Sequence, residues 1–225
     1  MMTYILFSIL NIGLILFVLI KIYKDKKIRR QGKDKIIIEL NKNLNSMIAS
    51  LIWFVTFIIL LRIFIIKTNE VYHLLHQDYI NSIFQLFNLE YLEHLRKYFL
   101  DNNMTRELVT IVSYKSNILS TLTLIIVSFC SLILESYLGW QRNIVYEHGI
   151  LFKSETISWN DIVDYQWSKV YKNNLLKKGV QYDLNISLQK VRFFYFNNEV
   201  KFIVNYEDKE LVNRVLKECV INGDT

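Results

Sequence analysis

The chain has 225 residues, of which 52% are hydrophobic, 21% are charged and none is proline, and its formal net charge is +6. The apolar residues gather in long blocks, a distribution that excludes an ordinary soluble protein built around one large core. The two cysteines, Cys130 inside an apolar block and Cys219 near the end of the chain, are expected in different compartments, which argues against a disulfide framework.

Three uncharged apolar stretches are the strongest signal in the sequence, at residues 1–20, 43–61 and 116–134. A hydrocarbon core of ~30 Å is crossed by about 20 apolar residues in an α-helix. We therefore expect transmembrane helices at about 3–21, 45–66 and 116–136. Together they define a membrane domain over residues 1–138. The first stretch has no basic region before it and no small-residue cleavage site, so we expect a retained anchor.

A cluster of cations follows the first stretch: Lys21, Lys24, Lys26, Lys27, Arg29, Arg30, Lys33 and Lys35. Residues 24–46 carry eight Lys and Arg against three acidic residues, whereas residues 68–115 carry four against six. Because basic loops stay in the cytoplasm, the sequence predicts a multi-pass protein of the cell membrane with its N-terminus outside and its C-terminal domain inside. The cations are also expected to attract anionic headgroups of the lipid bilayer, and this partner leaves no reason to expect nucleic acid.

The segments beside the second span are expected to be helical. Residues 24–42 are expected to form a cytoplasmic helix and turn, broken at Gly32, that leads into this span. The external segment 68–115 should contain an amphipathic helix, because apolar residues recur in steps of three and four. Such a helix would lie in the headgroup plane, pack on the spans or pack on a second copy. A break is expected at 101–103, with residues 106–115 extending the third span. The apolar positions are Ile80, Ile83, Phe84, Phe87, Tyr91, Leu95 and Tyr98.

The C-terminal part changes to the two-residue period that is typical of β-strands. His148-Gly149 separates residues 144–146 from 150–152, as a tight hairpin turn would, and Asn197-Asn198 separates 191–196 from 200–205 in the same way. Between these hairpins, one strand shows strict alternation. Its expected buried positions are Tyr182, Leu184, Ile186 and Leu188.

Two further strands and a final helix complete this part. Strands are expected at 157–159 and at 162–170, the latter with Val163, Tyr165 and Trp167 on one side. Residues 208–220 should form a helix with Asp208 as its N-cap. Six or seven strands before one helix predict a membrane α plus β chain that ends in a small β-barrel or sandwich capped by the helix. The apolar helix face comprises Leu211, Val212, Val215, Leu216 and Val220.

Three short runs stand out in these strands: Tyr146-Glu147-His148-Gly149-Ile150, Ile157-Ser158-Trp159-Asn160-Asp161-Ile162 and Tyr165-Gln166-Trp167. With the order of elements, they resemble a bacterial pleckstrin-homology-like domain over about residues 143–221, as found behind transmembrane helices in small integral membrane proteins of Gram-positive bacteria. The resemblance implies a cytoplasmic, membrane-proximal binding module. Its motif residues here are Gly149, Trp159, Asp161, Ile162, Tyr165 and Trp167. It implies no ligand residues, and residues 139–225, with twelve basic and eleven acidic side chains, lack the dense cation pocket that an inositol phosphate requires.

No catalytic or cofactor motif is present in the sequence. His73, His76, Glu90, Glu93 and His94 could in principle form an external zinc site, but polar positions on an amphipathic helix explain them more simply, so no metal is expected. The charged residues lie away from the middle of the spans, which disfavours an ion or proton transporter.

The composition and the resemblance together favour a non-enzymatic protein. Its cytoplasmic domain would bind a protein or peptide partner at the membrane, in regulation or immunity. The alternative is a ligand-gated, membrane-disrupting effector that oligomerises through its spans. Small residues such as Ser8 and Gly13 on the first span allow close helix contact and so permit a homo-oligomer.

Overall fold

The computed structural model of the chain describes residues 2–76, 78–168, 171–172, 180–189 and 198–220. The chain divides into two compact units. The helical unit comprises Met1–Phe17 and Ser50–Ile133, and the β unit comprises Val18–Ala49 and Leu134–Thr225. Each of the three longest helices contributes residues to both units. One end of every long helix is therefore part of the β unit.

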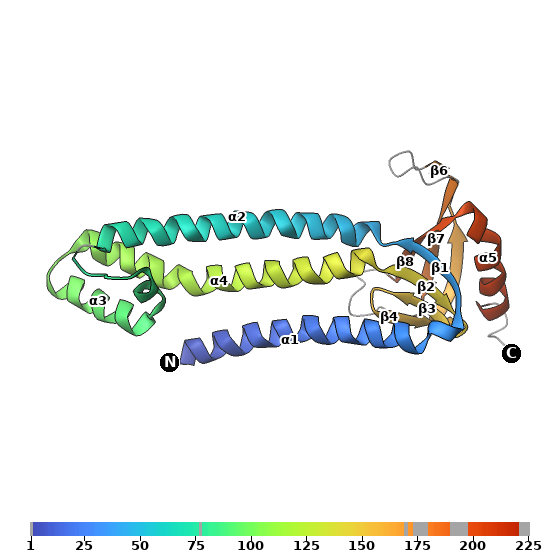
Figure 1. Ribbon diagram of the computed structural model, residues 1–225, viewed down its shortest axis with the longest axis horizontal. Coiled ribbons are helices and arrows are strands. Elements are labelled where there is room, and N and C mark those ends of the chain that lie inside the picture. Colours follow the sequence, from blue (N-terminus) through green and yellow to red (C-terminus); the bar gives the residue numbers. More distant parts are fainter. Residues whose placement is uncertain (1, 77, 169–170, 173–179, 190–197, 221–225) are drawn as a thin grey trace. The chain divides into compact units, whose positions relative to one another are not determined.

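The three long helices are those that the apolar stretches predicted (Figure 1). They have 30, 32 and 36 residues, more than the ~20 that cross a hydrocarbon core. Their apolar side chains are widely exposed, which is costly in water and favourable in lipid. These helices are compatible with a multi-pass membrane protein. They are α1 (Met2–Gln31), α2 (Leu44–Leu75) and α4 (Thr105–Trp140).

A small helical cap connects α2 to α4 within the helical unit. It consists of the 3-10 helix η2 (Ile83–Phe87) and helix α3 (Leu89–Asp101). The cap packs on the long helices rather than standing alone, because its buried side chains share one core with those of α2 and α4. The fully buried members of this core include Leu75, Ile80, Leu86, Leu92, Phe99 and Ile111.

The expected amphipathic helix is present as α3, but it begins only at Leu89, so the apolar positions from Ile80 to Phe87 are not part of it. The chain breaks at Asn88, whose side-chain oxygen accepts hydrogen bonds from the first backbone N–H groups of α3 and so starts a new helix. Because Phe84 lies before this break, it does not share one apolar face with the residues of α3, and its side chain is 78% exposed. The expected break at 101–103 is confirmed, with Asn103 at a φ of 53°, and α4 begins at Thr105 as an extension of the third span.

The first sheet contains a strand that the sequence analysis assigned to a helix and turn. Residues 36–42 form β1, which pairs antiparallel with β2. Three consecutive isoleucines suit a strand, because β-branched side chains fit a pleated surface, and the pairing with β2 decides the outcome. The expected turn at His148-Gly149 is confirmed. The sheet order is β1 (Ile36–Lys42), β2 (Arg142–Tyr146), β3 (Gly149–Phe152), β4 (Glu155–Ser158).

The second sheet is built around β7, whose strict alternation is confirmed by its buried side chains. Strands β5 and β8 pair with the same stretch of β7 and therefore flank it, while β6 pairs with the start of β7. A bulge follows Ile162 in β5 and leaves Val163 59% exposed, whereas Tyr165 and Trp167 pack on the core. The expected strand 191–196 lies outside the described residues. The strands are β5 (Ile162–Trp167), β6 (Tyr171–Lys172), β7 (Val180–Leu188) and β8 (Glu199–Asn205).

Helix α5 (Tyr206–Val220) follows β8 and completes the β unit (Figure 1). Its buried side chains share a core with those of both sheets. It begins two residues earlier than expected, so Asp208 lies in the first turn and is not the N-cap. Val212, Val215 and Leu216 are buried as predicted, whereas Leu211 is exposed. Within the described residues both sheets are open, so a closed pleckstrin-homology-like barrel is not observed.

Candidate binding site between strands β1 and β8

The two sheets meet where the edge strands β1 and β8 approach each other. No ladder joins these strands among the described residues; a side-chain hydrogen bond from Asn41 Nδ2 to Asn205 Oδ1, 2.9 Å long, connects them instead. Two hollows of about 530 and 430 Å³ lie along this boundary, and both are lined by Lys42. We call this region the β1–β8 cleft. Its lining includes Glu39, Asn41, Lys42, Asn143, Arg142, Lys201, Ile203, Asn205, Tyr206 and Glu207.

The cleft offers both charges and amide groups. Arg142 forms an ion pair with Glu39 at 2.9 Å, and Lys201 forms one with Asp183. Asn205 accepts a second hydrogen bond from Gln181 Nε2, at 3.2 Å. Gln181 is 2% exposed, and its Oε1 has no hydrogen-bond partner among the described residues. A lining with donors, acceptors and balanced charge suits a peptide backbone better than an apolar ligand or a strongly charged one.

A buried carboxylate lies behind the cleft, where the ends of α1 and α4 meet the first sheet. Asp25 of α1 is 0% exposed, and its Oδ2 accepts hydrogen bonds from Arg29 Nε at 2.7 Å and from the Tyr137 hydroxyl at 2.8 Å. Its Oδ1 has no partner among the described residues. Burying a carboxylate is costly unless a cation compensates it, and Arg29, one helical turn later, supplies that charge.

The same arginine connects the carboxylate to the cleft. Arg29 Nη1 donates to the backbone carbonyl of Arg142 at 2.9 Å, and the Arg142 side chain then reaches Glu39 in the cleft wall. A continuous chain of polar contacts thus runs from β1 through β2 and α1 to Tyr137 of α4. We call Asp25, Arg29 and Tyr137 the junction cluster.

Close backbone packing surrounds the junction cluster. A Cβ added at Gly139 of α4 would lie 3.0 Å from the backbone nitrogen of Met47, and one at Gly32 would lie 2.6 Å from the Tyr146 ring. The Tyr146 side chain is fully buried in this packing, and its burial raises the pKa of its hydroxyl above the usual range because the charged form is disfavoured there. Lys42 Nζ lies 4.3 Å from the centre of the Trp140 ring at the end of α4. The three helix ends and the first sheet are therefore closely packed within the β unit.

The eight predicted cations divide into two groups in the structure. Lys21 forms an ion pair with Glu155 at 2.9 Å, and Arg29 belongs to the junction cluster. The remaining six are exposed, and those on α1 lie about 100–160° around the helix from Asp25, at 3.6 residues per turn. Their role at lipid headgroups stays a prediction. The six are Lys24, Lys26, Lys27, Arg30, Lys33 and Lys35.

The residues of the pleckstrin-homology-like motif support the β unit and do not line the cleft. Gly149 follows the β2–β3 turn, and the backbone carbonyl of Asp161 accepts a hydrogen bond from Gln189. Trp159 and Ile162 are buried in the core, and Trp159 Nε1 donates to the Glu147 carbonyl at 2.8 Å. Tyr165 and Trp167 pack beside α5, where Trp167 Nε1 donates to Asn213 Oδ1 at 3.1 Å.

Sequence reasoning missed Asp25, Asn41 and Asn205. Asp25 was counted only as one acid within a basic segment, although its spacing of four from Arg29 was a visible signal for an ion pair. Asn41 and Asn205 are 164 positions apart, and no local pattern relates them.

Three of the residues weighed as a zinc site, His73, His76 and Glu93, have other contacts. The Tyr72 ring packs against His73 and His76, and the Glu93 carboxylate forms ion pairs with the side chains of Arg96 and Lys115. Among the described residues, no three His, Cys, Asp or Glu side chains are grouped so as to hold a metal ion.

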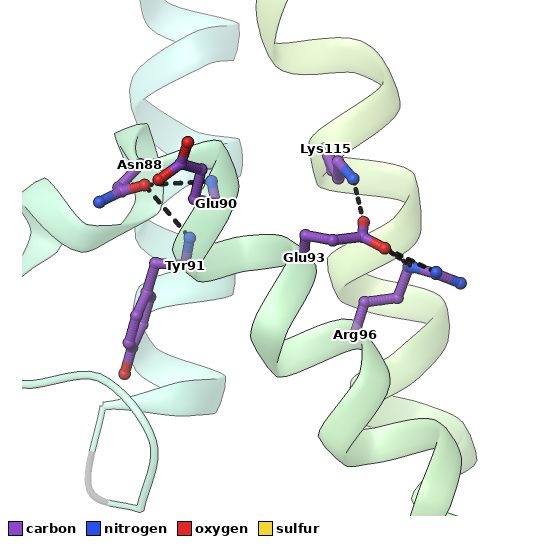
Figure 2. Close-up of polar contacts among 6 residues, drawn as sticks. All are labelled: Asn88, Glu90, Tyr91, Glu93, Arg96 and Lys115. Carbon is purple, nitrogen blue, oxygen red and sulfur yellow. Dashed lines mark hydrogen bonds and ion pairs between the residues drawn. The ribbon is translucent and has the colours of Figure 1, made fainter. Parts of the chain in front are cut away.

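Glu93 instead joins α3 to α4. Figure 2 shows its carboxylate between Lys115 of α4 and Arg96 of α3, with the Asn88 cap beside it. Arg96 Nη2 lies 2.6 Å from Glu93 Oε1. Hydrogen bonds from Arg96 and Lys115 lower the pKa of Glu93 from 4.5 to about 2. Glu93 is thus an electrostatic link between α3 and α4.

This link predicts a defined pH dependence. Because the folded-state pKa of Glu93 is depressed, its stabilisation is present above pH 4.5 and is lost as the pH falls toward 2. Glu93→Gln should lower the melting temperature at pH 7, and the difference from the wild type should vanish at the acidic end of a titration in detergent. Glu90→Gln, an exposed neighbour on α3, is the control and should show no such converging difference. A Glu93→Gln curve parallel to the wild type at every pH would contradict the role of this carboxylate.

Comparison with protein-family models, with curated proteins and with solved structures finds no match for this chain.

Proposed function

We propose that this chain is a non-enzymatic, membrane-anchored protein whose β unit binds a protein or peptide partner in the β1–β8 cleft, in a regulatory or immunity role. The observation that carries the proposal is the cleft itself: the pair Asn41 and Asn205 bridges β1 and β8 and lines one of the two hollows found there. The amide, charged and tyrosine side chains along the cleft can bind an extended peptide through its backbone and its side chains.

The placement of the cleft supports an anchoring or signalling role. Its wall residue Arg142 is linked to Arg29 and so to the junction cluster. A partner that displaced Glu39 from Arg142 would thus act on a contact chain that ends at α1 and α4. Membrane anchoring would hold the complex at the bilayer surface. A pleckstrin-homology-like origin of the β unit remains part of the proposal, supported by two packed antiparallel sheets and the C-terminal helix.

The orientation is also part of the proposal. Because β1 pairs with β2, the segment between α1 and α2 lies on the same side of the bilayer as the chain after α4. This arrangement results if α1, α2 and α4 each cross the bilayer once. The cap formed by η2 and α3 then lies on the side of the bilayer opposite the β unit. The exposed cations near the end of α1 favour the cytoplasm for the β unit. Trp140, 66% exposed at the end of α4, suits the depth of the headgroups.

The experiment compares two tyrosines of similar exposure. Tyr206 lines the cleft and is 63% exposed, whereas Tyr23 on α1 is 68% exposed and lines none of the described hollows. The full chain, solubilised from its native membrane, is used to recover bound proteins. We expect a partner that is recovered equally by the wild type and by Tyr23→Ala, and at least about tenfold less by Tyr206→Ala, because interface tyrosines commonly dominate binding. Equal recovery by both variants would contradict the proposed cleft.

A further inference from the structure

A groove of about 670 Å³ runs between α2 and α4 in the helical unit. All its lining residues come from these two helices, from Ile63 to Leu74 and from Arg106 to Thr121. Its volume lies within the ~300–1,000 Å³ range of pockets that hold small-molecule ligands. A groove on the surface of transmembrane helices is in contact with lipid, so the ligand nearest to it is an amphiphilic lipid molecule.

The groove crosses the level at which both helices change from apolar to polar. Thr68 and Tyr114, both buried, share a hydrogen bond of 3.3 Å and so lie at one level. The uncharged stretch of α4 starts directly beyond Lys115. That of α2 ends at Leu61, and after Arg62 the apolar residues continue to Ile66, next to Lys67. An α-helix rises ~1.5 Å per residue. Along α4, Thr121 lies about 9 Å from Lys115 toward the apolar stretch, and Arg106 lies about 13 Å from Lys115 in the opposite, polar direction.

The two ends of the groove differ in chemistry. Ile63, Phe64 and Ile118 line the part within the apolar stretches or at their margin. Lys67, Glu70 and Arg106 line the polar part. This division matches an amphiphile with acyl chains and a charged headgroup.

The charges at the polar end favour a headgroup with one negative charge. Lys67 Nζ and Glu70 Oε2 lie 3.0 Å apart and neutralise each other. Arg106 is exposed and has no ion pair among the described residues. The polar end therefore carries one uncompensated positive charge, and a guanidinium is well shaped to bind the oxygens of a phosphate.

We infer that this groove binds one phospholipid with a net charge of −1, its phosphodiester at Arg106 and its acyl chains directed along the groove toward Phe64 and Ile118. The site is distinct from the β1–β8 cleft and does not depend on the partner proposed there. It adds a lipid ligand on the side of the cap formed by η2 and α3.

The test measures binding of phosphatidylglycerol and phosphatidylcholine to the delipidated full chain in detergent by native mass spectrometry. We expect the wild type to bind one phosphatidylglycerol in preference to phosphatidylcholine. Arg106→Gln should weaken phosphatidylglycerol binding about tenfold, since hydrogen bonds to charged groups are among the stronger ones. Arg62→Gln is the matched control: Arg62 is an exposed arginine on α2 outside the groove, and its removal should leave binding unchanged.

A second variant tests the groove without changing charge. Ser113→Leu places a larger side chain in the lining and should reduce lipid binding while Arg106 is retained. Equal binding of both lipids by the wild type, or unchanged binding in Arg106→Gln, would overturn the inference. So would disulfide-linked dimers of Ser113→Cys in bilayers, in a background without Cys130 and Cys219, because a second copy would then occupy the groove.

Discussion

Arg29→Met should destabilise the chain by about 3 kcal/mol, which lowers the melting temperature of a chain of this size by about 6–12 °C. The variant leaves the carboxylate of Asp25 buried with the Tyr137 hydroxyl as its remaining donor. It also removes the hydrogen bond to the Arg142 carbonyl. Removing one partner of a buried ion pair is costly because the other charge is left uncompensated.

The next residue supplies the control. Arg30 is exposed and has no ion pair among the described residues, so Arg30→Met should change the melting temperature very little. The double variant Asp25→Leu with Arg29→Met removes both charges and should recover most of the loss, to within about 1–2 kcal/mol of the wild type. Equal effects of Arg29→Met and Arg30→Met would show that the junction cluster does not stabilise the β unit.

Gly149→Ala should destabilise the β unit by about 3 kcal/mol or more. Gly149 has a φ of +152°, a value that residues with a side chain rarely adopt. An added Cβ would lie 2.1 Å from the carbonyl oxygen of Ile157 on the neighbouring strand β4. The clash is with backbone, so relief requires β3 and β4 to separate or the β2–β3 turn to change.

Gly13→Ala is the matched control, because a Cβ at Gly13 of α1 meets nothing within 4 Å. The measurement is thermal unfolding of the full chain in detergent, followed by limited proteolysis of the C-terminal part. We expect early unfolding and rapid cleavage in Gly149→Ala and wild-type behaviour in Gly13→Ala. If the free energy of unfolding of Gly149→Ala lay within about 1 kcal/mol of the wild-type value, the close pairing of β3 with β4 at this position would be contradicted.

Elements with a local signal could be predicted from the sequence. Long uncharged runs fix α1, α2 and α4 by composition alone, and strict alternation from Tyr182 to Leu188 fixes β7. The His148-Gly149 turn is equally local. In each case a pattern within a short window is sufficient, because burial repeats with the period of the element.

Features that depend on distant partners could not be predicted. An isoleucine run such as 36–38 fits a helix or a strand, and pairing with β2, about a hundred residues later, decides between them. The bulge after Ile162 reverses which side of β5 faces the core, and alternation alone does not reveal it. Asp25 became a buried site only because Tyr137 of α4 lies against it.

The central claim, three crossings with the β unit in the cytoplasm, is tested most directly by cysteine labelling in intact cells. Single cysteines replace exposed residues in a chain without Cys130 and Cys219: Lys97→Cys on α3, Gln31→Cys at the end of α1 and Asn160→Cys in the β unit. A membrane-impermeant maleimide should label Lys97→Cys in intact cells, and the other two only after the membrane is permeabilised. Labelling of Asn160→Cys in intact cells, or different behaviour of Gln31→Cys and Asn160→Cys, would contradict this topology.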